Sequence, residues 1–397
     1  MIIGRRIRCQ VRPRGEPVDQ LMKPTCKICG SVFFPEPLIR LGGMPKAAQF
    51  LPCADQLKLE QGVDLEVCQC RGCGLVQLPA EPVPYYREVV RAAAFSPAME
   101  AFRKKQFRAF VNAFRLRGKK VLEPGCGRGE YLRLMAGAGV KACGLEYSAA
   151  SVRQCVKSGL KASRGFVASP AKIKGGPFQA FFTLNFLEHL PDPVSFLSGI
   201  AANLSEGGVG LVEVPNFDMI VKKKLFSEFI PDHLLYFTSG AFSSLLQRSG
   251  FKILELRPVW HDYILSAVVR KRAQLDLADF ETGRSAIKKK LLAYISRFKP
   301  GRVAAWGAGH QALAVMALAG LGGRLRYVVD SAPFKQGKYT PATHLPIVPP
   351  QRLDQDPVDA VIVMAASYSD EVASILRKKY GRRLAVAILR DHGLEQR

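Results

Sequence analysis

The chain has 397 residues, 48% of them hydrophobic, and a formal net charge of +25 at pH 7. This length and apolar content can bury more than one core, so we expect two or three domains and exclude a small single-module protein. No apolar stretch is long enough to span a bilayer, and the basic N-terminus lacks the apolar core of a signal peptide, so we expect a cytoplasmic protein without a membrane partner. The basic runs are scattered with little aromatic interleaving, so charge alone does not predict nucleic-acid binding.

Residues 1–22 are predicted to form a flexible basic extension, and residues 23–90 a zinc-binding domain. A Cys-x-x-Cys-Gly motif occurs twice there, beginning at Cys26 and at Cys70. Four thiolates suit a tetrahedral zinc ion, and the glycine after each pair lets the backbone turn so that its amides face the sulfurs. We therefore expect a structural Zn²⁺, with unliganded thiols as the alternative and Cys68 as the competing ligand. The predicted ligands are Cys26, Cys29, Cys70 and Cys73.

Residues 91–270 alternate predicted strands and helices in the order that builds a doubly wound α/β fold with a parallel sheet. A helix is expected to begin at Ser96-Pro97, where a capping residue precedes a proline in the first helical position. The alternation continues as far as residue 214. After an insertion, two strands at 252–257 and 263–269 are expected to pair antiparallel and close the sheet.

A glycine-rich turn follows the first strand of this domain and predicts a cofactor site. Its glycines let the backbone approach a ligand, and an acidic residue at the end of the second strand can accept both hydroxyls of a ribose. A pyrophosphate dinucleotide is the alternative, but its fingerprint places the last glycine further along. We expect S-adenosylmethionine (SAM). Its predicted contacts are Glu123, Gly125, Gly127, Gly129, Glu146, Leu184 and Asn185.

Residues 271–300 are predicted to form a linker helix, and residues 301–397 a smaller Rossmann-like domain. In the latter a strand at 303–306 precedes Gly307-Ala-Gly309, although such a short turn is common in any α/β unit. The lysine-rich loop that follows the second strand is more informative, because cations at the carboxyl edge of a sheet can neutralise a diphosphate. The candidate substrate-binding residues are Lys335, Lys338 and Tyr339.

Taken together, these features resemble the three-domain, SAM-dependent sugar C-methyltransferases of deoxysugar biosynthesis. The resemblance covers nearly the whole chain from Met22 and includes the paired cysteines, the glycine turn, the Lys-Gln-Gly-Lys-Tyr-Thr-Pro loop at 335–341 and a segment at 231–237. It implies a zinc-binding N-terminal domain, a central class I methyltransferase domain and a C-terminal Rossmann-like domain. It also implies methylation of a nucleotide-linked 4-keto-deoxyhexose at C-3, the carbon beside the ketone.

The resemblance also supplies candidate catalytic residues, because the family segment reads His-Glu-His followed by Tyr-Phe. A C–H bond beside a ketone loses its proton only to a positioned base, with the enolate oxygen stabilised. His233 is the implied base, Asp232 a residue that orients a neighbour, and Tyr236 a donor to the enolate oxygen. This chain departs from the family at Pro231 and Asp232, which replace the first histidine and the glutamate.

Three alternatives stay open at this point. Without the resemblance, His233 reads as a structural histidine, and two further histidines, His189 and His261, are alternative bases. The chain could instead be a zinc-knuckle protein that methylates or binds nucleic acid, or a sugar O- or N-methyltransferase. The C-terminal domain with its lysine-rich loop favours the nucleotide-sugar interpretation, since an RNA methyltransferase has no stated need for it. No motif addresses the oligomeric state or the identity of the sugar.

Overall fold

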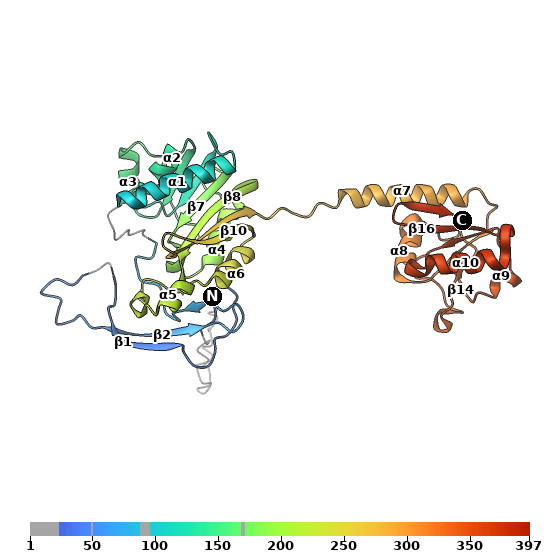
Figure 1. The fold of residues 1–397 in the computed structure, drawn as a ribbon, viewed down its shortest axis with the longest axis horizontal. Coiled ribbons are helices and arrows are strands. Elements are labelled where there is room, and N and C mark those ends of the chain that lie inside the picture. Colours follow the sequence, from blue (N-terminus) through green and yellow to red (C-terminus); the bar gives the residue numbers. More distant parts are fainter. Residues whose placement is uncertain (1–23, 49–50, 88–95, 168–170) are drawn as a thin grey trace, which may run out of the picture. The chain divides into compact units, whose positions relative to one another are not determined.

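The computed structural model describes residues 24–48, 51–87, 96–167 and 171–397, so the predicted extension at 1–22 lies outside the described residues. The chain forms two compact units, residues 1–273 and 274–397, which are described separately (Figure 1). Among the described residues, no helix is both long and apolar enough to cross a membrane.

The first unit contains a seven-stranded sheet in the order β10-β11-β8-β7-β4-β5-β6. The five strands from β8 to β6 pair in parallel, and β11 runs antiparallel between β8 and β10, which confirms the predicted α/β fold and its closing antiparallel pair. The strands are β4 (Lys120–Pro124), β5 (Lys141–Glu146), β6 (Ala162–Arg164), β7 (Phe178–Leu184), β8 (Leu204–Pro215), β10 (Phe251–Val259) and β11 (Ile264–Lys271).

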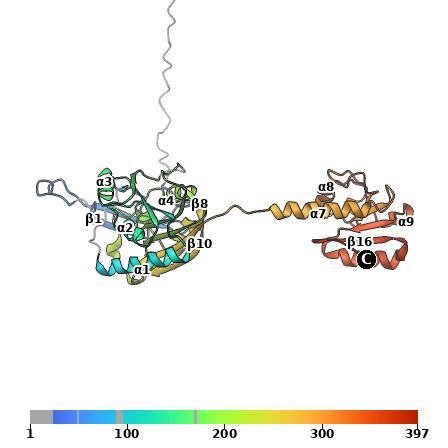
Figure 2. The ribbon, with the colours of Figure 1, turned by 90° about the horizontal axis from the view of Figure 1, so that it is seen from above.

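Helices cover both faces of this sheet (Figures 1 and 2). One core cluster joins the sheet to α1, α2 and α3, and another joins it to α4 and α6. As predicted, α1 begins after Ser96, whose side chain accepts a hydrogen bond from the Met99 amide. The helices are α1 (Pro97–Ala113), α2 (Glu130–Gly137), α3 (Ala149–Lys157), α4 (Pro193–Ala202), α5 (Phe217–Lys223) and α6 (Ser239–Arg248).

A second sheet of the first unit links the cysteine-rich segment to the methyltransferase segment. Its order is β1-β2-β3-β9, and each neighbouring pair is antiparallel. The strands are β1 (Ile39–Met44), β2 (Val63–Gln69), β3 (Val76–Gln77) and β9 (Leu235–Tyr236). Because β9 comes from the segment that carries the candidate base, the cysteine-rich segment holds that part of the chain directly. The two segments also share one hydrophobic core.

The second unit is a smaller Rossmann-like domain with a sheet in the order β14-β13-β12-β15-β16-β17, parallel except for β17. Helix α7 (Ala278–Ile295) packs its C-terminal residues Leu291, Tyr294 and Ile295 into this unit's core. The remaining elements are β12 (Val303–Trp306), α8 (His310–Ala319), β13 (Val328–Val329), β14 (Ile347–Val348), α9 (Arg352–Gln355), β15 (Ala360–Val363), α10 (Ser369–Tyr380), β16 (Ala385–Arg390) and β17 (Gly393–Gln396).

Candidate active site and metal centre

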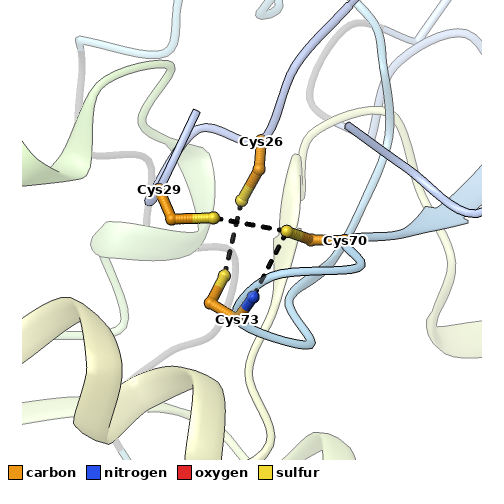
Figure 3. Close-up of side chains that lie close together, drawn as sticks. All are labelled: Cys26, Cys29, Cys70 and Cys73. Atoms are coloured by element: carbon orange, nitrogen blue, oxygen red, sulfur yellow. Dashed lines mark hydrogen bonds between the residues drawn. The ribbon is translucent and has the colours of Figure 1, made fainter. Parts of the chain in front are cut away.

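The four predicted metal ligands form one cluster, in which all four sulfur atoms lie within 4.8 Å of one another (Figure 3). The Sγ atoms of Cys26 and Cys73 are 3.5 Å apart, and those of Cys29 and Cys70 are 3.4 Å apart. A tetrahedral zinc ion with Zn–S bonds of about 2.3 Å requires sulfurs about 3.8 Å apart, so the cluster fits such an ion with little adjustment. Cys68, the competing ligand, lies on β2 outside the cluster.

The backbone around the cluster has the expected conformation. Gly30 and Gly74 have φ angles of 73° and 74°, the left-handed region that glycine adopts without steric cost. Backbone amides point at two of the sulfurs: the Ile28 amide donates to Cys26 Sγ over 3.4 Å, and the Gly72 amide to Cys70 Sγ over 3.2 Å. Such donors stabilise thiolates, the form in which cysteine binds a metal.

The glycine turn after β4 packs tightly against the elements beneath it. Gly125, Gly127 and Gly129 all have positive φ angles. A Cβ atom on Gly129 would lie 2.5 Å from Leu160 Cδ1, so a larger residue does not fit there without movement. The carboxylate of Glu146, at the end of β5, accepts hydrogen bonds from the amides of Gly127 and Ser148, both over 2.8 Å. The structure thus places the turn and the acidic residue side by side.

The remaining predicted cofactor contacts lie at the same edge of the sheet. Glu123 is buried in β4, directly before the turn. Leu184 ends β7, and Asn185 follows it with a φ angle of 50° and an exposed side chain. Since β4 and β7 are parallel neighbours, their carboxyl ends meet, and the structure brings these residues to the edge at which α/β sheets bind ligands.

Two of the candidate bases meet beside this edge. The rings of His189 and His233 contact each other edge to face, with centroids 4.8 Å apart. Glu188 completes the group: one carboxylate oxygen and one nitrogen of each ring all lie within 4.8 Å of one another. The sequence analysis missed Glu188, although an acidic residue four positions after the end of β7 was a usable signal. The third candidate, His261, is exposed on the turn between β10 and β11 and lies against Trp260.

Burial determines the charges in this cluster. Desolvation lowers the pKa of His233 to about 3, and it also lowers the pKa of His189. Desolvation raises the pKa of Glu188 to about 8. At neutral pH both imidazoles are therefore uncharged and able to accept a proton, while Glu188 holds one. The group has no net charge before a substrate arrives.

Hydrogen bonds fix the loop that carries His233. Asp232 is buried, and its carboxylate accepts a hydrogen bond from Tyr85 Oη over 2.7 Å and another from the Ala48 amide over 3.0 Å. The Asp232 carbonyl oxygen lies 2.7 Å from Nδ1 of His189. Asp232 thus ties three segments together around the two imidazoles, an arrangement in keeping with its predicted orienting role.

Tyr236 lies deeper than expected for a donor to substrate. Its hydroxyl accepts a hydrogen bond from the Ile230 amide over 3.1 Å and donates one to the Ile230 carbonyl oxygen over 3.2 Å. Burial raises the pKa of this phenol. Donation to an enolate oxygen would require Tyr236 to give up its bond to the Ile230 carbonyl, whereas in the structure the pair of bonds holds the loop before His233 in shape.

In the second unit, a cavity of about 510 Å³ lies at the carboxyl edge of the sheet beside Gly307 and Gly309. Asp330, at the end of β13, accepts hydrogen bonds there from the Ala308 amide over 2.8 Å and from Lys335 Nζ over 3.0 Å. Although burial opposes it, these bonds, together with one from the Ala332 amide, lower the pKa of Asp330.

Only one of the three predicted substrate-binding residues lines this cavity. Lys335 is on its wall, whereas Lys338 and Tyr339 lie beyond the turn at Gly337 and outside the cavity lining. Tyr339 is exposed and bridges to Pro346 on the strand leading to β14. The lysine-rich loop is therefore divided between the cavity wall and the adjoining surface.

Two family models match the chain. A methyltransferase domain matches residues 99–256, and a C-terminal domain of C-methyltransferases matches residues 271–388. The first match spans the seven-stranded sheet and its helices apart from β11 and the end of β10, and the second covers the second unit as far as β16.

Known proteins differ in how much of the chain they match. The C-methyltransferase NovU from Streptomyces niveus is 24% identical over 392 residues, covering 90% of this chain and 91% of NovU. A ubiquinone biosynthesis O-methyltransferase from Thiobacillus denitrificans is 32% identical over 99 residues, 23% of this chain and 43% of that enzyme. The solved structure of a magnesium protoporphyrin IX methyltransferase from Synechocystis with bound SAH is 16% identical, covers 46% of this chain and 90% of its own, and gives a TM-score of 0.37. Similarity to NovU thus extends along both units.

Proposed function

We propose that this SAM-dependent methyltransferase is a C-methyltransferase that methylates a nucleotide-linked keto-deoxysugar at the carbon beside the ketone, through an enolate; the two domain matches and the similarity to NovU support this proposal. The observation that carries the proposal is the pair of uncharged, half-buried imidazoles of His189 and His233 at the edge of the sheet where the cofactor is expected. Transfer to carbon needs a base next to the methyl donor, and this pair supplies one.

His233 is proposed as the base. The proton on the carbon beside the ketone passes to a nitrogen of His233, and the electron pair left behind moves toward the ketone oxygen. Its low pKa keeps His233 free of a proton at neutral pH, and the enolate formed in the same step provides the negative charge that stabilises the new imidazolium. Bound SAM supplies an electrophilic methyl group on its sulfonium. The enolate carbon would form a bond to this methyl group as the S–CH3 bond breaks, with that bond's electron pair left on sulfur in S-adenosylhomocysteine. His233 would then release its proton to water.

The cysteine cluster is proposed to hold a structural Zn²⁺. The sulfur spacing and the amides that face the sulfurs support this assignment. Four cysteine ligands leave no position for water, so the ion would serve stability and not chemistry. Its contribution to the reaction would be indirect, because β3 of the cysteine-rich segment pairs with β9, directly after His233.

The cavity of the second unit is proposed to bind the nucleotide part of the substrate. Lys335 lies on its wall with one ion pair to Asp330. A diphosphate there would gain a charge-assisted hydrogen bond from this lysine. Lys338 and Tyr339 would act from the adjoining surface. The chain's excess of positive charge would favour any such anionic substrate.

The proposal is tested with SAM and a panel of 4-keto nucleotide sugars in deuterated water, followed by mass spectrometry. The wild type is expected to add one methyl group and to exchange deuterium at the carbon beside the ketone. His233→Ala should lose both activities while still binding SAM in calorimetry. His261→Ala, on the exposed turn, is the matched control and should behave like the wild type.

Three outcomes would contradict the proposal. Methyl transfer without exchange in the wild type would leave an oxygen or nitrogen acceptor or an irreversible deprotonation; a new methyl group found on oxygen or nitrogen in the product would contradict the proposal. Unchanged turnover of His233→Ala would remove that residue from the mechanism. No reaction across the panel, with RNA binding that weakens steeply as salt rises, would favour the nucleic-acid alternative.

A further inference from the structure

Arg87 lies within a group of three aromatic rings. Its guanidinium is 5.3 Å from the ring centroid of Tyr86, 5.6 Å from that of Tyr147 and 5.4 Å from that of Phe166. Its Nε also donates a hydrogen bond to Tyr86 Oη over 2.9 Å. The rings support one another, since Phe166 meets both tyrosines edge to face. An exposed arginine is thereby held in one place by contacts that are individually weak.

This group closes a narrow cavity next to the glycine turn. The cavity measures about 10 Å³, the space of roughly one water molecule. Its wall includes Arg87, Gly125, Tyr147, Phe166 and Phe186. Gly125 opens the turn, and Tyr147 directly follows Glu146, the residue expected to hold the ribose. The cavity therefore lies where the adenine of the cofactor would extend beyond the ribose.

An adenine ring is far larger than one water molecule, so a wall must move before it can enter. Phe186 is buried, Phe166 packs against the main core of the first unit, and the turn is backbone. Arg87 differs from these walls because its long side chain is exposed to solvent. Displacing it costs three cation–π contacts and one solvent-exposed hydrogen bond, to Tyr86 Oη, which water can replace. An adenine would offer the same rings a new partner for stacking.

We propose that Arg87 is the gate of the adenine subsite: it moves aside to admit the cofactor and returns to cover the adenine once it is bound. The gate rests on the cofactor position proposed above, at the glycine turn and Glu146. It makes Arg87 a positioning residue for SAM, acting on the adenosine end and not on the methyl group.

The experiment measures binding rates by surface plasmon resonance with the full-length protein immobilised. The two probes are S-adenosylhomocysteine and 5′-methylthioadenosine, which carry no net charge, so that a lost arginine charge does not alter the rates by long-range attraction. In Arg87→Ala both the association and the dissociation rate constants should rise about three- to tenfold. Without the arginine side chain nothing has to move before the ligand enters, and nothing covers the ligand once it is bound. The dissociation constant should change much less than either rate.

The control is Arg71→Ala. Arg71 also lies over an aromatic ring, 5.5 Å from the centroid of Phe34, but in the cysteine-rich segment. Its removal takes away the same charge and the same kind of contact, and both rates should stay at the wild-type values. Equal changes in Arg71→Ala and Arg87→Ala would overturn the gate.

The rates separate the gate from simpler roles. A rise in dissociation alone would make Arg87 a fixed wall, and a rise in association alone would make it an obstruction that never covers the ligand. Either result, or unchanged rates, overturns the gate. Failure of the wild type to bind either probe would instead refute the proposed cofactor site, so the two failures are distinguishable.

Discussion

Replacing Glu188 by glutamine should change how stability depends on pH. Glu188 is 1% exposed, and its Oε2 has no hydrogen-bond partner among the described residues. Burial raises its pKa from an ordinary 4.5 to about 8. The folded chain therefore binds the Glu188 proton more tightly than the unfolded chain does, and this proton adds to the free energy of unfolding. The contribution is fully present below about pH 4.5 and is lost as the pH rises through 8. Linkage gives a loss of about 3 kcal/mol between about pH 5.5 and about pH 8.5.

Glutamine has the same shape and does not ionise, so Glu188→Gln should lack this loss. The assay is urea unfolding at several pH values, followed by tryptophan fluorescence. The two tryptophans, Trp260 and Trp306, belong to different units. A Trp306→Phe background therefore leaves Trp260 to report on the first unit alone, and every variant carries it.

The comparison is between the slopes of unfolding free energy against pH. Contributions from the histidines are common to both proteins and cancel in the difference. Glu206→Gln, at an exposed carboxylate of the same unit, tests whether any such substitution flattens the curve. Parallel slopes for Glu188→Gln and the wild type would refute the reasoning, because they would mean that Glu188 ionises as easily in the folded protein as in the unfolded chain.

Two further changes test other parts of the first unit. Cys70→Ala should abolish zinc content measured by plasma mass spectrometry and lower the melting temperature, whereas Cys68→Ser should keep both; zinc retained by Cys70→Ala would contradict the ligand assignment. Arg103→Ala should lower the free energy of unfolding by about 3–5 kcal/mol, since it leaves the buried carboxylate of Glu213 without its ion pair. In the double variant Arg103→Met with Glu213→Leu the free energy of unfolding should fall much less. If urea unfolding showed the same fall in the double variant as in Arg103→Ala, the unpaired charge would not be the cause.

The sequence predicted those features that depend on neighbouring residues. The strand at 303–306, the cap at Ser96 and the glycine turn each follow from local spacing or capping chemistry, and the structure has them at those positions. The two cysteine pairs are far apart in sequence, but each is a local motif. A tetrahedral metal ion binds four such thiolates, so the proximity of the two pairs in the fold could also be predicted.

Features that depend on distant pairing had no such signal. Nothing near Leu235 indicates that it completes a sheet with β3, because a strand of two residues has no periodicity to read. The bond from Tyr85 to Asp232 is equally hidden. The residues Lys335, Lys338 and Tyr339 are predicted together as substrate-binding residues, yet a turn at Gly337 separates Lys335 from the other two. The direction of the backbone after Gly337 determines which of these side chains reach the cavity, and composition does not reveal that direction.

The pairing of β3 with β9 also constrains how the chain is made. A ribosome releases both cysteine pairs long before it synthesises Leu235 and Tyr236. The proposed zinc ion would therefore bind first, before β3 has its partner strand. The N-terminal segment would then pass through a stage in which it holds the metal but lacks β9. At that stage the backbone amides and carbonyls on the free edge of β3 would still be exposed to solvent. Excising this segment as a separate module would leave it permanently at that stage.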